Sequence, residues 1–352
     1  MKMYKMSHTQ QTPSSQTPPS QTPPSLAPSQ TPSHIKKSPS LGGGTPSLAP
    51  PHPRDALIEF DAGPHKYTCA GEAGYMSVTT WNHTHFPKFD ADAIITKMMS
   101  NKRTWLNSPY YGKTREEIKA GWDKNRDEAA AAGTAMHYAI ECYYRGALPP
   151  TPPDSVEGSS VEGSSVEGSS VEGSSVEGSS VEGSSVEGSS VEGSSVEGSS
   201  PEAGAGVRGQ SPLFVAFLAA HPHLKPYRTE WMIFNEDIKL AGSVDMVYEN
   251  ESDGSLMIYD WKRCKDIKKT NSFGAFALTE CISHLPDTNF WHYALQLNTY
   301  KAILEAKYEK KVSQMCLVCL HPNLPTYEIH IVPELTEEMA DLFALRRADL
   351  NK

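Results

Sequence analysis

The stretch Ile258-Tyr259-Asp260-Trp261-Lys262 ends an apolar run with an acid and a lysine two residues apart. Because successive side chains of a strand point to opposite faces, Asp260 and Lys262 should share one face and Trp261 should point away. Fifteen residues before Asp260, Asp245 ends the strand-like run 241–245. Two carboxylates and an ammonium gathered at strand ends can hold a divalent metal and assist hydrolysis. These residues therefore predict a metal-dependent hydrolytic site.

The surrounding pattern predicts an α/β fold with a central sheet. Thr114 and Glu117 have the spacing of a capping box and predict the start of a helix. Gly133 interrupts an alanine-rich helical run, where glycine is costly, and so predicts close approach to another backbone or to a ligand. We expect extended segments over 66–69, 75–78, 228–235, 240–249, 256–262, 314–320 and 327–332, and helices over 89–99, 114–122, 124–145, 213–218, 289–308 and from 336 onward.

Two segments have compositions that cannot form a packed core. Residues 1–53 are rich in Pro, Ser, Thr and Gln, and we predict a disordered tail. Residues 156–200 are nine copies of Val-Glu-Gly-Ser-Ser, and we predict a flexible insert over 149–211. The remaining chain, 54–148 and 212–352, then forms the two halves of one domain, with the active site in the second half.

Net charge does not restrict the function once the repeat is set aside. The formal charge is −10, but the repeat contributes nine Glu, and without them 32 Lys and Arg face 33 Asp and Glu. A near-neutral core neither favours nor excludes a nucleic-acid partner.

The six cysteines and the absence of a signal-peptide pattern predict a reduced, intracellular protein, without distinguishing nucleus, cytoplasm, mitochondrion or a viral origin. No apolar run is long enough to predict a membrane span. Cys316 and Cys319 form a CxxC, but they lie in a strand-like run, so we expect no iron–sulfur cluster.

Five motifs occur in one order: GTAMHYAIE at 133–141, Glu230 in TEWMIF, AGSVD at 241–245, YDWK at 259–262 and QLNTY at 296–300. Together they resemble the RecB-like branch of the PD-(D/E)XK nuclease superfamily, and within it the mitochondrial genome maintenance exonucleases and related proteins of large DNA viruses. The resemblance covers about residues 64 to 320. It implies a restriction-endonuclease-like core, with a mixed sheet flanked by helices.

The resemblance also implies roles for individual residues. Asp245, Asp260 and His137 match metal ligands, and the Trp261 carbonyl matches the backbone oxygen of the same metal shell. Lys262 matches the lysine that positions or deprotonates the attacking water and stabilises the transition state. Mixed His and carboxylate ligation suits Mn²⁺ as well as Mg²⁺.

Two further acids have open roles. Glu141 lies one helical turn after His137 and either contacts the metal through water or orients the histidine. Glu230 matches a family acid whose role the sequence does not define. We expect it to contact the metal-binding residues rather than the metal itself.

The nucleic-acid contacts come from two further groups. Gln296 and Tyr300 share a helix face, and in the family this pair contacts nucleic acid beside the active site. Arg263 and Lys265 belong to a basic run after the active-site strand that either follows a phosphate backbone or is a solvated loop.

We therefore expect a deoxyribonuclease, specifically an exonuclease that acts on single-stranded ends or flaps in replication, repair or recombination. The alternatives are a nuclease for RNA or duplex ends, and a binding protein that retains the fold without catalysis. Protein partners are not indicated.

Overall fold

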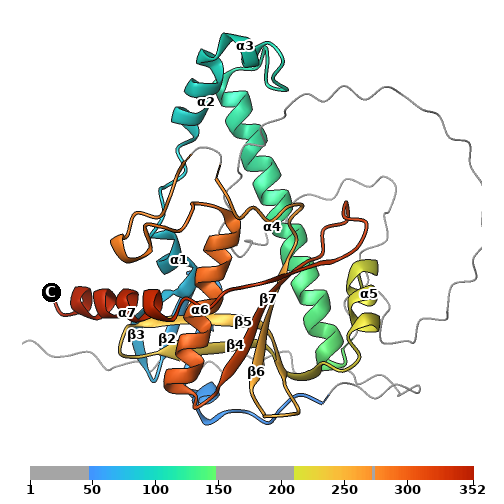
Figure 1. Cartoon of the computed structure of the whole chain (residues 1–352), viewed down its shortest axis with the longest axis vertical. Coiled ribbons are helices and arrows are strands. Elements are labelled where there is room, and N and C mark those ends of the chain that lie inside the picture. The colour runs from blue at the N-terminus through green and yellow to red at the C-terminus, as the bar shows by residue number, and fades with distance from the viewer. Residues whose placement is uncertain (1–46, 148–209, 272–273) are drawn as a thin grey trace, which may run out of the picture. The chain divides into compact units, whose positions relative to one another are not determined.

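A computed structural model describes residues 47–147, 210–271 and 274–352 (Figure 1). The predicted disordered tail up to residue 46 and the predicted insert from 149 to 209 lie outside the described residues. The last residues of that tail are described, and the Ala49 N–H donates to the Tyr227 carbonyl at 3.0 Å. The chain therefore makes contacts with the sheet before residue 54.

The described residues form one eight-stranded sheet in the order β1-β2-β3-β5-β6-β7-β8, with β4 paired to β5 off this path. The pairs β3–β5 and β6–β7 are parallel and the others are antiparallel, which confirms the expected mixed sheet. The strands are β1 (Ile58–Asp61), β2 (Lys66–Cys69), β3 (Glu72–Ser77), β4 (Lys225–Asn235), β5 (Leu240–Glu249), β6 (Leu256–Lys262), β7 (Val312–Cys319) and β8 (Glu328–Ile331).

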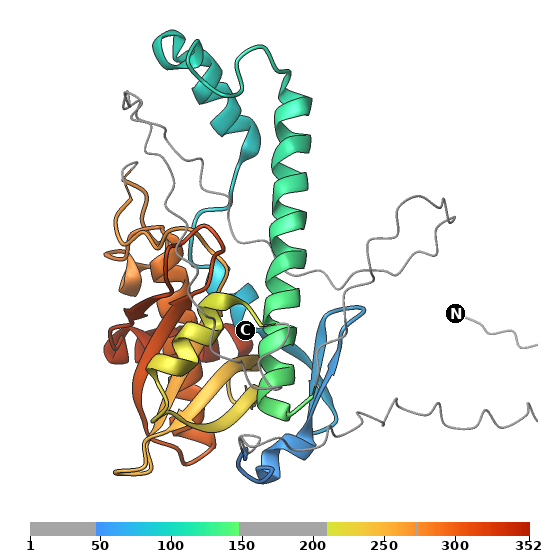
Figure 2. The same ribbon diagram turned by 90° about the vertical axis from the view of Figure 1, so that its right-hand side faces the viewer.

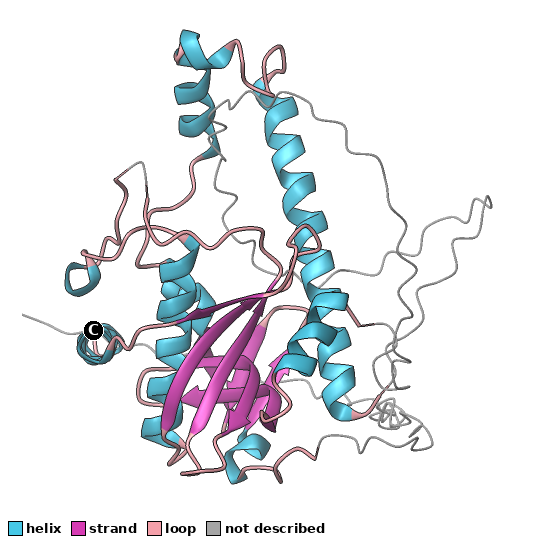
Figure 3. Cartoon of the chain, turned by 45° about the vertical axis from the view of Figure 1, so that its right-hand side comes forward, coloured by secondary structure: helices cyan, strands magenta, loops and turns pink. Residues whose placement is uncertain are grey.

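Helices pack on both faces of this sheet, as Figure 3 shows. One core cluster joins the sheet to α1, α6 and α7, and a second joins the opposite face to α4 and α5. The expected α/β fold with flanking helices is confirmed. The helices are α1 (Val78–His83), α2 (Ala91–Ser100), α3 (Lys102–Trp105), α4 (Arg115–Arg145), α5 (Pro212–Ala220), α6 (Asn289–Lys307) and α7 (Thr336–Leu350), with short 3₁₀ helices η1 (Pro53–Leu57) and η3 (Glu280–Ile282).

Helix α4 corrects the prediction of two helices over 114–122 and 124–145, because it runs without a break (Figure 2). The predicted capping box is present: Thr114 Oγ1 accepts from the Glu117 N–H, and the Glu117 carboxylate accepts from the Thr114 N–H. Arg126 pairs with Asp123, one helical turn earlier and at the expected break. Such an i,i+3 pair favours the helix through a polar stretch that has no apolar stripe of its own.

Two elements that were not among the predicted ones precede β2. They are η1 and β1, and β1 pairs with β2. The expected strand over 75–78 ends one residue early, since Ser77 caps α1 by accepting from the Thr80 N–H.

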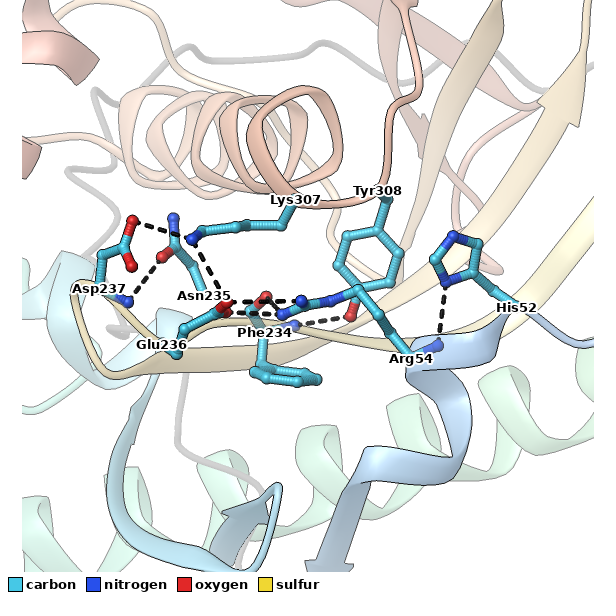
Figure 4. Close-up of polar contacts among 8 residues, drawn as sticks. All are labelled: His52, Arg54, Phe234, Asn235, Glu236, Asp237, Lys307 and Tyr308. Atoms are coloured by element: carbon cyan, nitrogen blue, oxygen red, sulfur yellow. Dashed lines mark hydrogen bonds and ion pairs between the residues drawn. The ribbon is translucent and has the colours of Figure 1, made fainter.

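An ionic cluster attaches this N-terminal segment to β4 and α6, as Figure 4 shows. The Arg54 guanidinium lies 2.7 Å from the Glu236 carboxylate and donates to the Phe234 carbonyl. Lys307 pairs with the same Glu236 at 3.3 Å, and the Tyr308 hydroxyl accepts from the Phe234 N–H. Burial opposes the charge of Glu236, but Arg54 and Lys307 outweigh it and hold the pKa of this carboxyl at about 2. The cluster fixes the C-terminus of α6 to the β4–β5 hairpin.

Two glycines differ in what a side chain would meet. A Cβ on Gly242 would lie 2.8 Å from the Tyr300 ring, so β5 and α6 approach closely only because this residue has no side chain. By contrast, apart from its chain neighbours and the backbone of its own helix, no described atom lies within 4 Å of a Cβ on Gly133. The predicted close approach of a backbone at Gly133 is therefore wrong for the described residues.

We expect Gly242→Ala to lower the free energy of unfolding by about 1–3 kcal/mol, because the buried Tyr300 ring cannot move without disturbing the core. Gly133→Ala is the matched control and should raise it by about 1 kcal/mol, since alanine is the better helix former. Denaturant unfolding measures both. Equal effects of the two substitutions would show that the Gly242–Tyr300 contact does not constrain the fold.

Candidate active site

The candidate site lies where β5 and β6 separate. Their pairing ends at Met246 and Tyr259, so Asp245 and Asp260 are the next residues along the diverging strands. The Asp245 carboxylate accepts a hydrogen bond from the Trp261 N–H at 3.0 Å. A side chain therefore takes the place of a cross-strand carbonyl at this point of the sheet.

The alternation of β5 also changes at Asp245. Regular alternation would place Val244 and Met246 on one face, but Val244 packs in the cluster of α6 and Met246 packs in the cluster of α4. Strand β5 thus twists locally at Asp245, and this turns the carboxylate toward the gap between the strands.

Helix α4 brings His137 to the same gap. Its Nε2 lies 2.9 Å from the Trp261 carbonyl oxygen, and its Nδ1 lies 3.5 Å from Asp245 Oδ2. Nδ1 is also 3.7 Å from Glu230 Oε1. The next turn of α4 is buried against the sheet through Ile140, which holds the histidine over the strand ends.

Glu230 completes a group that the sequence did not define. One ligand atom each from His137, Glu230 and Asp245 lies within 4.8 Å of the others. Glu230 adopts φ +46° in the middle of β4, where its neighbours pair regularly with β5 and it does not. A left-handed non-glycine residue costs about 1 kcal/mol or more and persists only where the surroundings enforce it. The Ser243 hydroxyl donates to the Glu230 carboxylate at 3.1 Å and contributes to that enforcement.

Asp260 and Lys262 lie together on the face toward α6. The Lys262 ammonium is 2.7 Å from Asp260 Oδ2, and Asp260 is only 2% exposed. Trp261 points to the opposite face, where it packs against Phe214 and Phe217. The expected alternation therefore holds in the geometry. Among the described residues, however, the three-residue group that could hold a metal contains Glu230 in place of Asp260.

The electrostatics of the site show an excess of buried acid. Burial raises the pKa of Asp245, against the opposing effect of His137, and raises the pKa of Asp260 to about 6. Burial alone would lower the pKa of His137, but Asp245 and Glu230 outweigh it and raise this pKa to about 9. Charged carboxylates are thus costly here, and the imidazole takes a proton to offset them.

The donor set fits a divalent cation. Carboxylate oxygens, one imidazole and a nearby backbone carbonyl are ligands of Mn²⁺ and Mg²⁺, and a cation would supply the positive charge that the buried acids lack. The residues present are therefore compatible with the metal that the sequence implied.

The other predicted site residues lie around this centre. The Gln296 amide donates to the Tyr300 hydroxyl at 3.0 Å, and Tyr300 is buried, so Gln296 is the member of the pair that reaches the surface. Glu141 pairs with Arg145 at 2.9 Å, and burial raises its pKa. Arg263 is half-buried and Lys265 is exposed, and neither forms an ion pair with a described residue.

The CxxC lies in β7 as the strand prediction required, with Cys316 and Cys319 packed on opposite faces of the sheet. Cys319 Sγ lies 3.6 Å from Cys264 Sγ. No helix among the described residues is both long and apolar enough to cross a membrane.

Comparison with protein families decides the relationship. The model of the PD-(D/E)XK nuclease superfamily matches residues 109–350. The chain belongs to this superfamily. Its members are nucleases, so membership implies a nucleic-acid substrate and phosphodiester hydrolysis. The family model spans the candidate site residues from His137 to Tyr300.

Other comparisons add little. A solved structure titled "Crystal structure of SSO0001" is similar at 15% identity and a TM-score of 0.21, over 39% of this chain. The match spans 56% of that chain, a little over half its length. No curated protein matches the chain.

The raised pKa of His137 makes cation binding dependent on pH. A ligating imidazole must be neutral, so a cation competes with the proton that His137 holds below about pH 9. We expect the apparent affinity for Mn²⁺ to rise about tenfold per pH unit from pH 7 toward 9, with release of about one proton. Titration calorimetry in buffers of different ionisation enthalpy measures both quantities.

The same pKa makes the stability of the metal-free protein depend on pH. The contribution of the imidazolium to stability is complete below pH 6.5 and is lost as pH rises through about 9.

Two substitutions test the pH dependence of cation affinity. His137→Gln should remove the slope of log affinity against pH. His330→Gln removes a histidine paired with Glu328 on β8 and should leave that slope unchanged. An affinity independent of pH in the unsubstituted protein contradicts the assignment of His137.

Proposed function

We propose that the chain is a metal-dependent deoxyribonuclease that acts as an exonuclease on single-stranded ends or flaps during replication, repair or recombination. Within the superfamily, we propose a relationship to the mitochondrial genome maintenance exonucleases and the similar proteins of large DNA viruses. The observation that carries the proposal is the convergence of His137, Glu230 and Asp245 beside the Asp260–Lys262 pair.

In this proposal His137, Asp245, Asp260 and the Trp261 carbonyl hold Mg²⁺ or Mn²⁺, and Glu230 joins them as a ligand. The bound cation would polarise the scissile phosphate and lower the pKa of a water molecule. Glu141 pairs with Arg145 and lies outside the group of residues that could hold a metal, so we propose no direct contact with the cation.

Lys262 acts through its charge. Burial would lower the pKa of Lys262, but Asp260 and Asp245 outweigh this effect and raise it above its ordinary value. An ammonium at neutral pH cannot take a proton from water. Lys262 therefore positions the phosphate and stabilises the negative charge that develops in the transition state.

Substrate choice is tested with end-labelled single-stranded, duplex and flap DNA and with matched RNA, each with Mn²⁺, Mg²⁺ or chelator. We expect cation-dependent release of short products from free single-stranded DNA ends, and no release when the ends are blocked. Preferential cleavage of RNA or duplex ends would contradict the proposed single-stranded DNA substrate but would agree with metal-dependent phosphodiester hydrolysis. Binding without cleavage would indicate a nucleic-acid-binding protein that retains the fold without catalysis.

Lys262→Ala should fold normally and lose nearly all cleavage, because the transition state loses its cationic partner. Circular dichroism checks the fold, and single-turnover rates with saturating DNA measure the chemistry. Lys225→Ala is the control, since Lys225 pairs with Glu249 at the start of β4, away from the site. Cleavage retained by Lys262→Ala in a clean preparation would contradict the role of Lys262 in stabilising the transition state.

The basic run makes a separate prediction. If Arg263 and Lys265 contact phosphates, the double alanine substitution should weaken DNA binding and reduce the slope of log affinity against log salt by about 1.4, roughly 0.7 for each contact on single strands. Binding is measured by fluorescence anisotropy at several salt concentrations. An unchanged slope means that the run is a solvated loop.

A further inference from the structure

Helix α6 presents three residues to the site on one face. Tyr293, Gln296 and Tyr300 follow at i, i+3 and i+7, a spacing that aligns side chains on a helix. Gln296 and Tyr300 contact each other, and Tyr300 packs against Gly242 of β5. Tyr293 continues the same face by one turn and meets Lys262.

The Lys262 ammonium lies between an acid and a ring. It is 2.7 Å from Asp260 Oδ2 and 4.3 Å from the centroid of the Tyr293 ring. Its side chain is 17% exposed, so the contact with the ring is largely shielded from water. The face of an aromatic ring attracts a cation, and the attraction is strongest where water is excluded.

The two contacts act differently on the charge of the lysine. A carboxylate holds an ammonium and also cancels its charge toward a third group. A ring carries no net charge, so it fixes the position of the ammonium without cancelling more of its charge than Asp260 already does. A lysine side chain has four rotatable bonds and loses much entropy when it is held, so a second contact is needed to place the ammonium reproducibly.

We propose that Tyr293 is a positioning residue of the active site, whose ring holds the Lys262 ammonium toward the scissile phosphate. The inference rests on the proposed nuclease function and extends it from the Gln296–Tyr300 pair to a third residue of α6. One face of the Tyr293 ring is covered by the Lys262 ammonium, and the neighbouring Trp291 indole N–H donates to the Lys269 carbonyl at 3.0 Å.

The test varies the electron density of the ring at position 293 while its size stays nearly constant. Tyr293→Phe keeps the ring and should retain activity within about threefold, whereas Tyr293→Leu should lower kcat about tenfold or more, with little change in the KM for DNA. Phenylalanine analogues with one, two and three fluorine atoms at position 293 withdraw electrons from the ring at nearly constant size. We expect log kcat to fall stepwise along this series.

A purely structural role predicts another pattern, in which the fluorinated variants are equally active and only Tyr293→Leu loses activity together with stability. That result overturns the inference. Equal kcat for Leu and Tyr overturns it as well.

A second readout separates this inference from the proposed function. The Lys262 side-chain methylene resonances, assigned by comparison with Lys262→Arg, should show a ring-current shift in the protein and in Tyr293→Phe, and none in Tyr293→Leu. This measurement needs no substrate. A protein that cleaves no polynucleotide but shows the shift retains the contact and loses the function, whereas the absence of the shift removes the contact itself.

Discussion

The hydrogen bond from the Trp261 N–H to the Asp245 carboxylate is the interaction on which the site depends. Strands β5 and β6 separate at this point, and a buried N–H left without an acceptor would be costly. The carboxylate supplies the acceptor and is thereby fixed in the gap. Because Trp261 is also anchored by ring contacts with Phe214 and Phe217, its carbonyl is directed to His137. This bond thus satisfies the strand ends and aligns the candidate metal-binding groups of β5, β6 and α4.

The site gains this alignment at the expense of stability. Asp245 and Asp260 are buried with raised pKa values, and Glu230 adopts a left-handed backbone inside a strand. Each feature disfavours the folded state, and each concerns a residue of the candidate site. Strain and buried charge concentrated in one place are expected where the chain preserves geometry for a ligand. Large apolar clusters pack on both faces of the sheet and offset this cost.

The sequence predicted local features well and tertiary ones less well. The apolar run 256–262 corresponds to β6 residue for residue, and its alternation placed Asp260 beside Lys262 because both depend only on strand geometry. The single helix α4 was predicted as two helices, because no apolar stripe connects its halves and charged pairs such as Asp123–Arg126 are only a weak helix signal. Glu230 was left without a role, because a left-handed residue within β4 follows from packing that alternation cannot reveal. The glycine that matters for close approach is Gly242, whose partner Tyr300 is distant in sequence.

Helix α6 connects parts of the molecule that would otherwise be independent. At its N-terminus, Asn289 holds the basic run by hydrogen bonds to the Asp266 carbonyl and the Lys268 N–H. Its middle carries the face that meets Lys262 and Gly242, and its C-terminus is fixed by the ionic cluster around Glu236. A rigid helix attached at both ends positions side chains more accurately than a loop can. The cations of the basic run are on a loop, but this loop is held by Asn289 of the same helix, so its position is fixed relative to the candidate metal-binding residues.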